Sequence, residues 1–152
     1  MFLFWKKRPI LDEDSQQRIV ACIKEAESRT TGEVRVFVEH HCSYMNAMDR
    51  AVELFGSLGM FKTERRNATI VYVAVTDRQF AIFGDTAIYE KAGGPAFWES
   101  AAARLKEDLK NNEITQGLCD AVNELGNALA AHFPYDPSVP KNELPDEIVF
   151  GK

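Results

Sequence analysis

The sequence predicts an α/β protein with a mixed, mostly parallel, small β-sheet flanked by helices on both faces, which is a three-layer α/β/α sandwich. Two observations carry this prediction. Residues 68–75 form an unbroken apolar run, which is typical of a central strand buried on both faces. The expected order of segments is helix, strand, helix, strand, strand, helix, helix, and this order is typical of a sheet covered on both sides.

The first half of the chain predicts two helices and one strand. Aspartate is a favoured N-cap, so the first helix is expected to begin near Asp12 or Asp14. Residues 33–38 alternate valine with other residues and predict the first strand. A second helix follows, and helical spacing turns three of its apolar residues toward the core: Met48, Val52 and Phe55.

The remaining elements follow from the central apolar run. A helix joins the first two strands, so they are expected to be parallel with a right-handed crossover. The short polar break at 76–78 returns the chain as an antiparallel strand at 80–85. Beyond Gly93-Gly94-Pro95, apolar stripes predict two more helices, and residues 148–150 are expected to pin the tail or to add an edge strand.

The length of 152 residues predicts a single folded domain. We expect an N-terminal extension over residues 1–10, an α/β domain over 11–133, and a tail over 134–152 that packs on the domain or extends from it. Prolines and acidic residues gather in this last segment. An apolar content of 45% and a charged content of 27% are ordinary for a soluble globular protein.

Charge and cysteine content argue against several classes of protein. A net charge of -5 gives no overall basic footprint for nucleic acid. No segment approaches the roughly 20 apolar residues of a membrane-spanning helix, and the N-terminal run has its basic residues after its apolar ones, the reverse of a signal peptide. Three widely spaced cysteines favour a reducing compartment, so we expect a cytoplasmic protein in which Cys22 and Cys119 are small core residues.

Oxygen-bearing side chains are expected to gather at one end of the sheet. Glu33 opens the first strand, Asn67 precedes the second, and Asp85 ends the third. Carboxylate and amide oxygens, with carbonyls of the loop at 86–89, suit a hard cation such as Ca²⁺ or Mg²⁺. The alternative is structural: Glu33 caps a loop and Asp85 holds a turn.

Other chemistry has weaker support. His40, His41 and Cys42 are consecutive, so alternation along a strand turns neighbouring side chains to opposite faces and works against a shared metal. The sequence contains no nucleophile elbow and no phosphate-binding glycine motif. Arg65 and Arg66 precede the central strand and are candidates to hold a phosphate.

The order of several short motifs resembles the TPM domain family. The stretch Thr31-Gly32-Glu33-Val34 is similar to the family's first-strand opening, and Arg66-Asn67 stands before the apolar strand, where family members commonly have an acid before the asparagine. Asp77-Arg78 matches the family's turn, and Phe83-Gly84-Asp85 occupies the place of its glycine-rich segment. The resemblance spans about residues 11–133.

The resemblance implies a compact α/β sandwich, a divalent-cation site and weak phosphatase-type activity in some members. It assigns the cation site to Asn67 and Asp85, with Glu33 as a further ligand. We therefore hold three hypotheses: a cation-binding accessory module that engages a protein partner, a metal-dependent phosphatase-like hydrolase, and a purely structural or assembly protein. The aromatic N-terminus favours a protein partner, and the missing acid at position 66 weakens the phosphatase reading.

Overall fold

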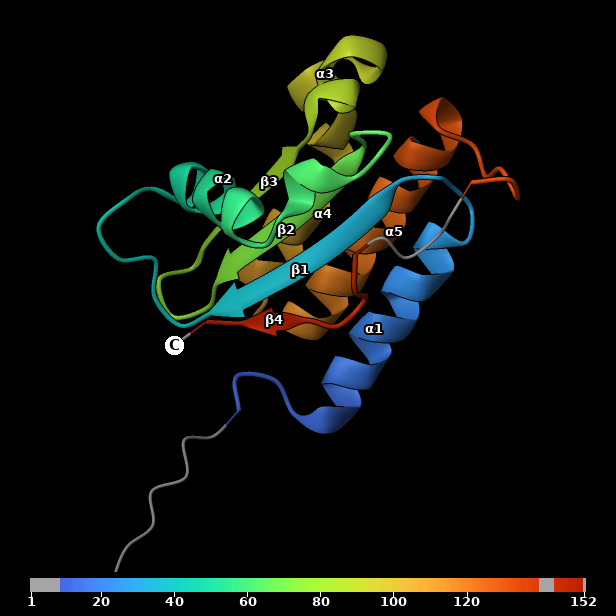
Figure 1. Cartoon of the computed structure of the whole chain (residues 1–152). Helices are drawn as coiled ribbons and strands as arrows, with labels where there is room; N and C mark the ends of the chain where they lie inside the picture. The colour runs from blue at the N-terminus through green and yellow to red at the C-terminus, as the bar shows by residue number, and fades with distance from the viewer. Residues whose placement is uncertain (1–8, 140–143, 152) are drawn as a thin grey trace, which may run out of the picture.

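The computed structural model describes residues 9–139 and 144–151 (Figure 1). The helices are α1 (Glu13–Glu27), α2 (Ala47–Ser57), α3 (Thr86–Ala92), α4 (Glu99–Lys110) and α5 (Ile114–His132). The strands are β1 (Glu33–Glu39), β2 (Ala68–Ala74), β3 (Gln79–Gly84) and β4 (Val149–Phe150), and short 3-10 helices cover η1 (Met60–Lys62) and η2 (Gly94–Trp98).

The sheet has the strand order β3-β2-β1-β4. β1 is parallel to both of its neighbours, and β2 pairs with β3 antiparallel. Every residue of β1 and β2 is buried, as expected for central strands covered on both faces. The predicted mixed, mostly parallel sheet between helices is confirmed.

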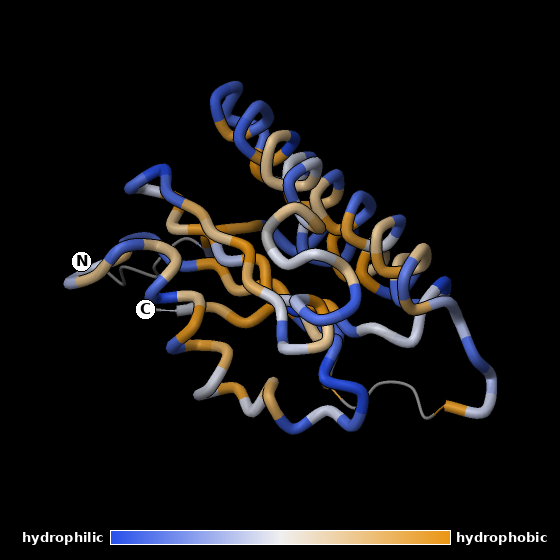
Figure 2. Tube along the Cα trace, turned by 90° about the horizontal axis from the view of Figure 1, so that it is seen from above, coloured by the Kyte–Doolittle hydropathy of each residue, from blue (hydrophilic) through white to orange (hydrophobic). Residues whose placement is uncertain are grey.

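The two faces of the sheet carry separate apolar cores (Figure 2). On one face, alternate β1 residues such as Val34 and Val36 pack with α1, α4 and α5. On the other face, Phe37, Ile70 and Tyr72 pack with α2. The period-two alternation of β1 therefore divides its side chains between two cores.

The segment after β3 differs from its prediction. The expected loop at 86–89 lies inside the short helix α3, whose N-cap is Asp85 and whose end is marked by Gly93 with φ 86°. A helix of seven residues gives too short a stretch for periodicity to reveal it. Backbone carbonyls of a helix are engaged in intrahelical hydrogen bonds, so this segment is a poorer source of cation ligands than a loop.

The core face of α2 matches its prediction only at Phe55. Ala51, Leu54 and Phe55 are buried, whereas Met48 and Val52 are 41% and 38% exposed. The buried residues are three and four positions apart and form the stripe that faces β2 and β3. This helix has more apolar positions than one sheet face can cover.

Within residues 9–139 and 144–151, no helix has the length and apolar character needed to cross a membrane.

Two helical glycines provide a test of this packing. A Cβ atom on Gly126 of α5 would lie 2.8 Å from Ala26 Cβ of α1, so we expect Gly126→Ala to lower the free energy of unfolding by about 1–3 kcal/mol. Gly56 of α2 has its nearest neighbour at 3.8 Å, and Gly56→Ala should stabilise by up to about 1 kcal/mol. Urea denaturation of both variants measures the difference, and equal effects would contradict the close helix contact.

Candidate functional site

An ion pair holds the end of the sheet where β2 begins. Arg66 donates from Nε to Asp85 Oδ2 at 2.8 Å and from Nη2 to Asp85 Oδ1 at 3.0 Å. The backbone N–H of Thr86 donates to the same Oδ1 at 2.6 Å and begins α3. The Asp85 side chain is fully buried, whereas that of Arg66 is 43% exposed.

Aromatic rings surround this ion pair. The Arg66 guanidinium lies 5.7 Å from the centroid of the Phe61 ring, a distance typical of a cation–π contact. Phe61 and Tyr89 both contact Phe83, and both are partly exposed at 38% and 46%. Arg66 itself has a φ of 54°, which is an uncommon backbone conformation for a residue other than glycine. The neighbouring Arg65 is exposed.

The other two predicted cation ligands have different hydrogen-bond partners. Asn67 is 1% exposed and donates from Nδ2 to Thr31 Oγ1 at 3.2 Å. Glu33 is 3% exposed, and its Oε1 accepts from the backbone N–H of Leu144 at 2.6 Å. The structure thus places the three predicted residues at one end of the sheet and joins each of them to a separate partner.

The strand register shows how near two of them lie. Glu33 of β1 is the register partner of Ala68 of β2, and the backbone N–H of Asp85 donates to the Ala68 carbonyl at 3.0 Å. Glu33 and Asp85 therefore flank the same small residue from its two sides.

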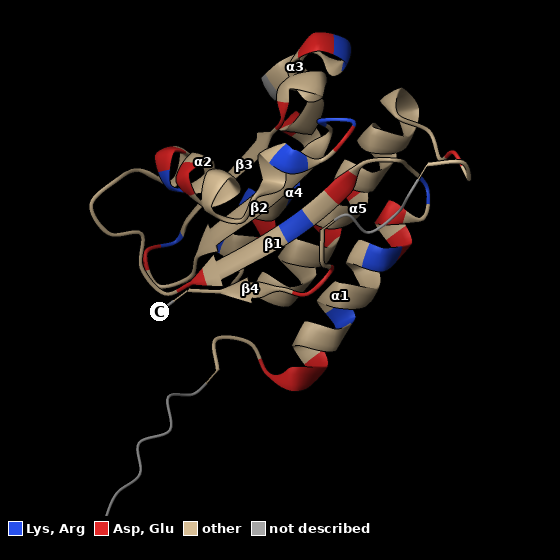
Figure 3. Ribbon diagram, in the orientation of Figure 1, with Lys and Arg blue, Asp and Glu red and all other residues tan. Residues whose placement is uncertain are grey.

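Glu33 belongs to an acidic group that the sequence does not reveal. Glu27 at the end of α1 accepts from the backbone N–H of Val34 at 2.8 Å and is hydrogen-bonded to Asp146. Figure 3 shows acidic positions beside α1 where the chain approaches β4. Burial, together with the hydrogen bond to Asp146 and its charge, raises the pKa of Glu27 to about 9. Glu27 is therefore protonated at neutral pH.

Arg35 of β1 supplies positive charge beside this acidic group. Its side chain is 8% exposed, its Nε has no hydrogen-bond partner among the described residues, and burial lowers its pKa. The negative charges of Glu147, Asp146 and Glu33 counter that shift.

The opposite end of the sheet carries a second buried carboxylate. Glu39 of β1 is 4% exposed. Its carboxylate accepts hydrogen bonds from Arg50 Nε at 2.9 Å, from Arg50 Nη2 at 3.1 Å and from the Tyr72 hydroxyl. The hydrogen bonds to Glu39 raise the pKa of Arg50, and burial raises that of Tyr72. This network joins α2 to β1 and β2 and gives each oxygen of Glu39 at least one hydrogen-bond donor.

The adjacent histidines lie just beyond the end of β1 and have separate partners. His41 Nδ1 lies 2.9 Å from Asp77 Oδ1, and His40 Nδ1 lies 3.3 Å from Thr76 Oγ1. Within the described part of the chain, no group of three or more histidine, cysteine, aspartate or glutamate side chains is placed to hold a metal ion.

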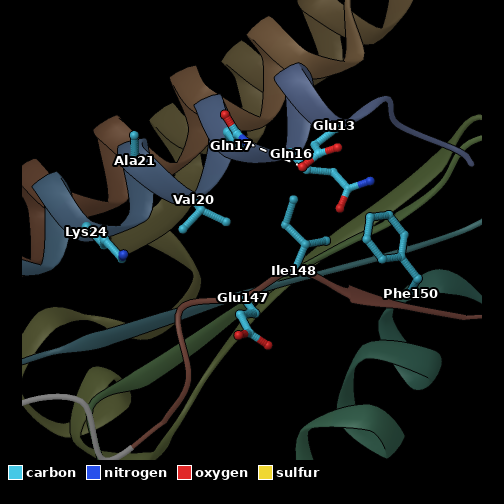
Figure 4. Close-up of a pocket in the computed structure, with 9 residues that line it drawn as sticks. All are labelled: Glu13, Gln16, Gln17, Val20, Ala21, Lys24, Glu147, Ile148 and Phe150. Atoms are coloured by element: carbon cyan, nitrogen blue, oxygen red, sulfur yellow. Dashed lines mark hydrogen bonds between the residues drawn. The ribbon is translucent and has the colours of Figure 1, made fainter.

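A groove of about 560 Å³ lies between α1 and the edge strand β4 (Figure 4). Its α1 wall carries Gln16, Val20 and Lys24, and its other wall carries Glu147, Ile148 and Phe150. The groove combines an apolar floor with a polar rim, which is the composition of a small recognition surface.

Comparisons with known proteins agree with the fold. The sequence profile of the TPM domain matches residues 6–128. The solution structure of the BA42 protein from the psychrophilic bacterium Bizionia argentinensis is similar, with 34% sequence identity, a TM-score of 0.88, and coverage of 97% of this chain and 100% of that chain. The N-terminal domain of the cg2496 protein from Corynebacterium glutamicum has the same fold at 12% identity, a TM-score of 0.67, and coverage of 95% and 97%. Among curated proteins none matches.

The Glu27 proton makes stability depend on pH. The folded pKa of about 9 lies above the ordinary value of 4.5, so this stabilisation is complete below about pH 4.5 and is lost as the pH rises to about 9. Glu27→Gln mimics the protonated acid, so it should be more stable than the wild type by an amount that grows by roughly 2–4 kcal/mol between pH 5 and pH 9. Thermal unfolding across this range measures the difference. The control Glu107→Gln, on the exposed surface of α4, should run parallel to the wild type. A Glu27→Gln profile that also runs parallel to the wild type would contradict the raised pKa of Glu27.

Proposed function

The chain belongs to the TPM domain family, and from this premise we propose that it is an accessory module that binds Ca²⁺ or Mg²⁺ and engages a protein partner. The cation site is the end of the sheet formed by Asn67, Asp85 and Glu33. The observation that carries this proposal is the Asp85 carboxylate, which is buried while both of its oxygens face one partly exposed guanidinium.

The donor chemistry at this end fits a hard cation. A buried carboxylate requires a compensating positive charge, and Arg66 supplies it in the structure. A divalent cation meets the same requirement and prefers oxygen ligands. Glu33 lies across Ala68 from Asp85, so a second carboxylate stands at the same end of the sheet, two strands away.

The geometry sets a condition on binding, because Arg66 must leave before a cation can take its place. The Arg66 side chain is long and 43% exposed, so it can turn into solvent at a modest cost. Binding is therefore a competition between the guanidinium and the cation for Asp85, and the affinity is expected to be weak.

Substitutions at the two partners test this competition. Arg66→Gln removes the competing charge and should tighten Ca²⁺ binding by roughly three- to tenfold. Asp85→Asn should abolish binding and still cap α3, because asparagine is as good an N-cap as aspartate. A Ca²⁺ titration of isotope-labelled protein, followed through backbone amide shifts near Asn67 and Gly84, measures both effects.

Asp77→Asn is the matched control for this titration. Asp77 also accepts a backbone N–H, from Cys42 at 2.7 Å, but it lies at the other end of β2. Its variant should bind Ca²⁺ like the wild type. The proposed site is wrong if Asp85→Asn keeps the wild-type titration, or if millimolar Ca²⁺ and Mg²⁺ cause no localised shift in either the wild type or Arg66→Gln.

A metal-dependent phosphatase-like activity is the second candidate, and the exposure of Arg66 favours it. A cation that displaces Arg66 from Asp85 would release a guanidinium beside the metal, with the exposed Arg65 next to it. Arginine holds phosphate oxygens through paired hydrogen bonds. The cation would polarise the phosphoryl group and ready a water for hydrolysis of a phosphomonoester.

Hydrolysis of p-nitrophenyl phosphate tests the second candidate. Turnover should require Ca²⁺ or Mg²⁺, stop on chelation, and fall at least tenfold in Arg66→Ala. Turnover that survives both the chelator and Asp85→Asn would contradict an activity at this site. If neither cation binding nor turnover is found, a purely structural or assembly role is the remaining proposal. A cytoplasmic location stays part of the proposal, on the basis of the three cysteines.

A further inference from the structure

Helices α1 and α5 share a seam along which they run in the same direction. Arg18 hydrogen-bonds Gln116 near the start of the seam, and Ala26 lies against Gly126 further along it. Between these contacts, Cys22 Sγ and Cys119 Sγ are 2.7 Å apart. This separation is only about 0.7 Å longer than a disulfide bond. Helix packing on both sides of the cysteines therefore holds the two sulfurs close together.

The surroundings of the two sulfurs give them different roles. Cys119 is 5% exposed, and burial raises the pKa of its thiol to about 12. Cys22 is partly exposed at the edge of the same core. A reagent in solution therefore reaches Cys22 first, and Cys119 is placed to react with whatever forms there.

We propose that Cys22 and Cys119 are a redox-sensitive pair that closes to an intramolecular disulfide when the protein meets a small-molecule disulfide such as oxidised glutathione. The proposal is independent of the cation site and of any partner. It assigns to the seam a modification that joins two cysteines 97 residues apart in the sequence.

The reaction proceeds by two thiol–disulfide exchanges. The Cys22 thiolate attacks one sulfur of oxidised glutathione, a mixed disulfide forms, and one glutathione thiolate leaves. The Cys119 thiol gives its proton to solvent and attacks the Cys22 sulfur, and the protein disulfide forms as the bond between Cys22 and glutathione breaks. The second glutathione leaves as a thiolate that takes up a proton from solvent. Two protein thiols are oxidised and one small disulfide is reduced to two thiols, so no further oxidant is needed. In a reducing compartment the pair stays open until the thiol pool is oxidised.

Incubation of the full-length protein with excess oxidised glutathione tests the proposal. We expect the intact mass to fall by about 2 Da and the three thiols of the native chain to fall to one, with a digest that joins Cys22 to Cys119. The closed loop is long, so the oxidised protein should unfold at a temperature higher by roughly 5–15 °C.

Three serine variants make the test specific. Cys119→Ser should stop at the mixed disulfide and keep one glutathione on Cys22. Cys22→Ser should form no internal disulfide. Cys42 is partly buried against the core on the other face of the sheet, so Cys42→Ser should lose about 2 Da like the wild type. The proposal fails if the wild type keeps all of its thiols under excess oxidant, or if its disulfide contains Cys42.

Discussion

The structure depends on how β1 accommodates charge, because this strand is buried along its whole length and still carries two carboxylates and a guanidinium. An uncompensated charge in such a place would cost several kcal/mol. The rest of the fold supplies the compensation. Helix α2 brings Arg50 to Glu39, and the segment before β4 brings a backbone N–H to Glu33 and acidic groups to Arg35. Helix α2 and the segment before β4 are therefore fixed by charges as well as by apolar contacts.

Buried carboxylates in this protein are stabilised in three different ways. Glu39 and Asp85 each bind a guanidinium, Glu33 accepts a backbone N–H, and Glu27 keeps its proton. The guanidinium at Asp85 differs from that at Glu39, because Arg66 is 43% exposed whereas Arg50 is 24% exposed and also held by Glu53. The partner of Asp85 is the more readily exchanged one. This difference is why the proposed cation site lies at Asp85.

Much of the fold could be predicted from the sequence, because its strongest signals are local. The apolar run of β2 and the long stripe of α5 reveal a buried strand and a core-facing helix without any tertiary information. The end of the sheet that holds Glu33, Asn67 and Asp85 follows from strand order alone. The partner of Glu33 could not be predicted, because Leu144 comes from a segment more than 100 residues away from β1. Tertiary packing, which local sequence patterns do not reveal, determines three further features: the short helix α3, the exposed apolar side of α2 and the proton on Glu27.

The return of β4 to β1 also has a consequence for biosynthesis. Leu144 meets Glu33 across 111 residues of chain, so a ribosome adding about 5–20 residues per second releases β1 several seconds before its outer neighbour exists. During that interval the strand has an unsatisfied edge, and such edges template association between nascent chains. The charged side chains of β1 then act as gatekeeper residues, because charge on an unpaired strand disfavours aggregation with another nascent chain. The charged residues that are costly to bury in the folded protein would thus protect the nascent chain from aggregation.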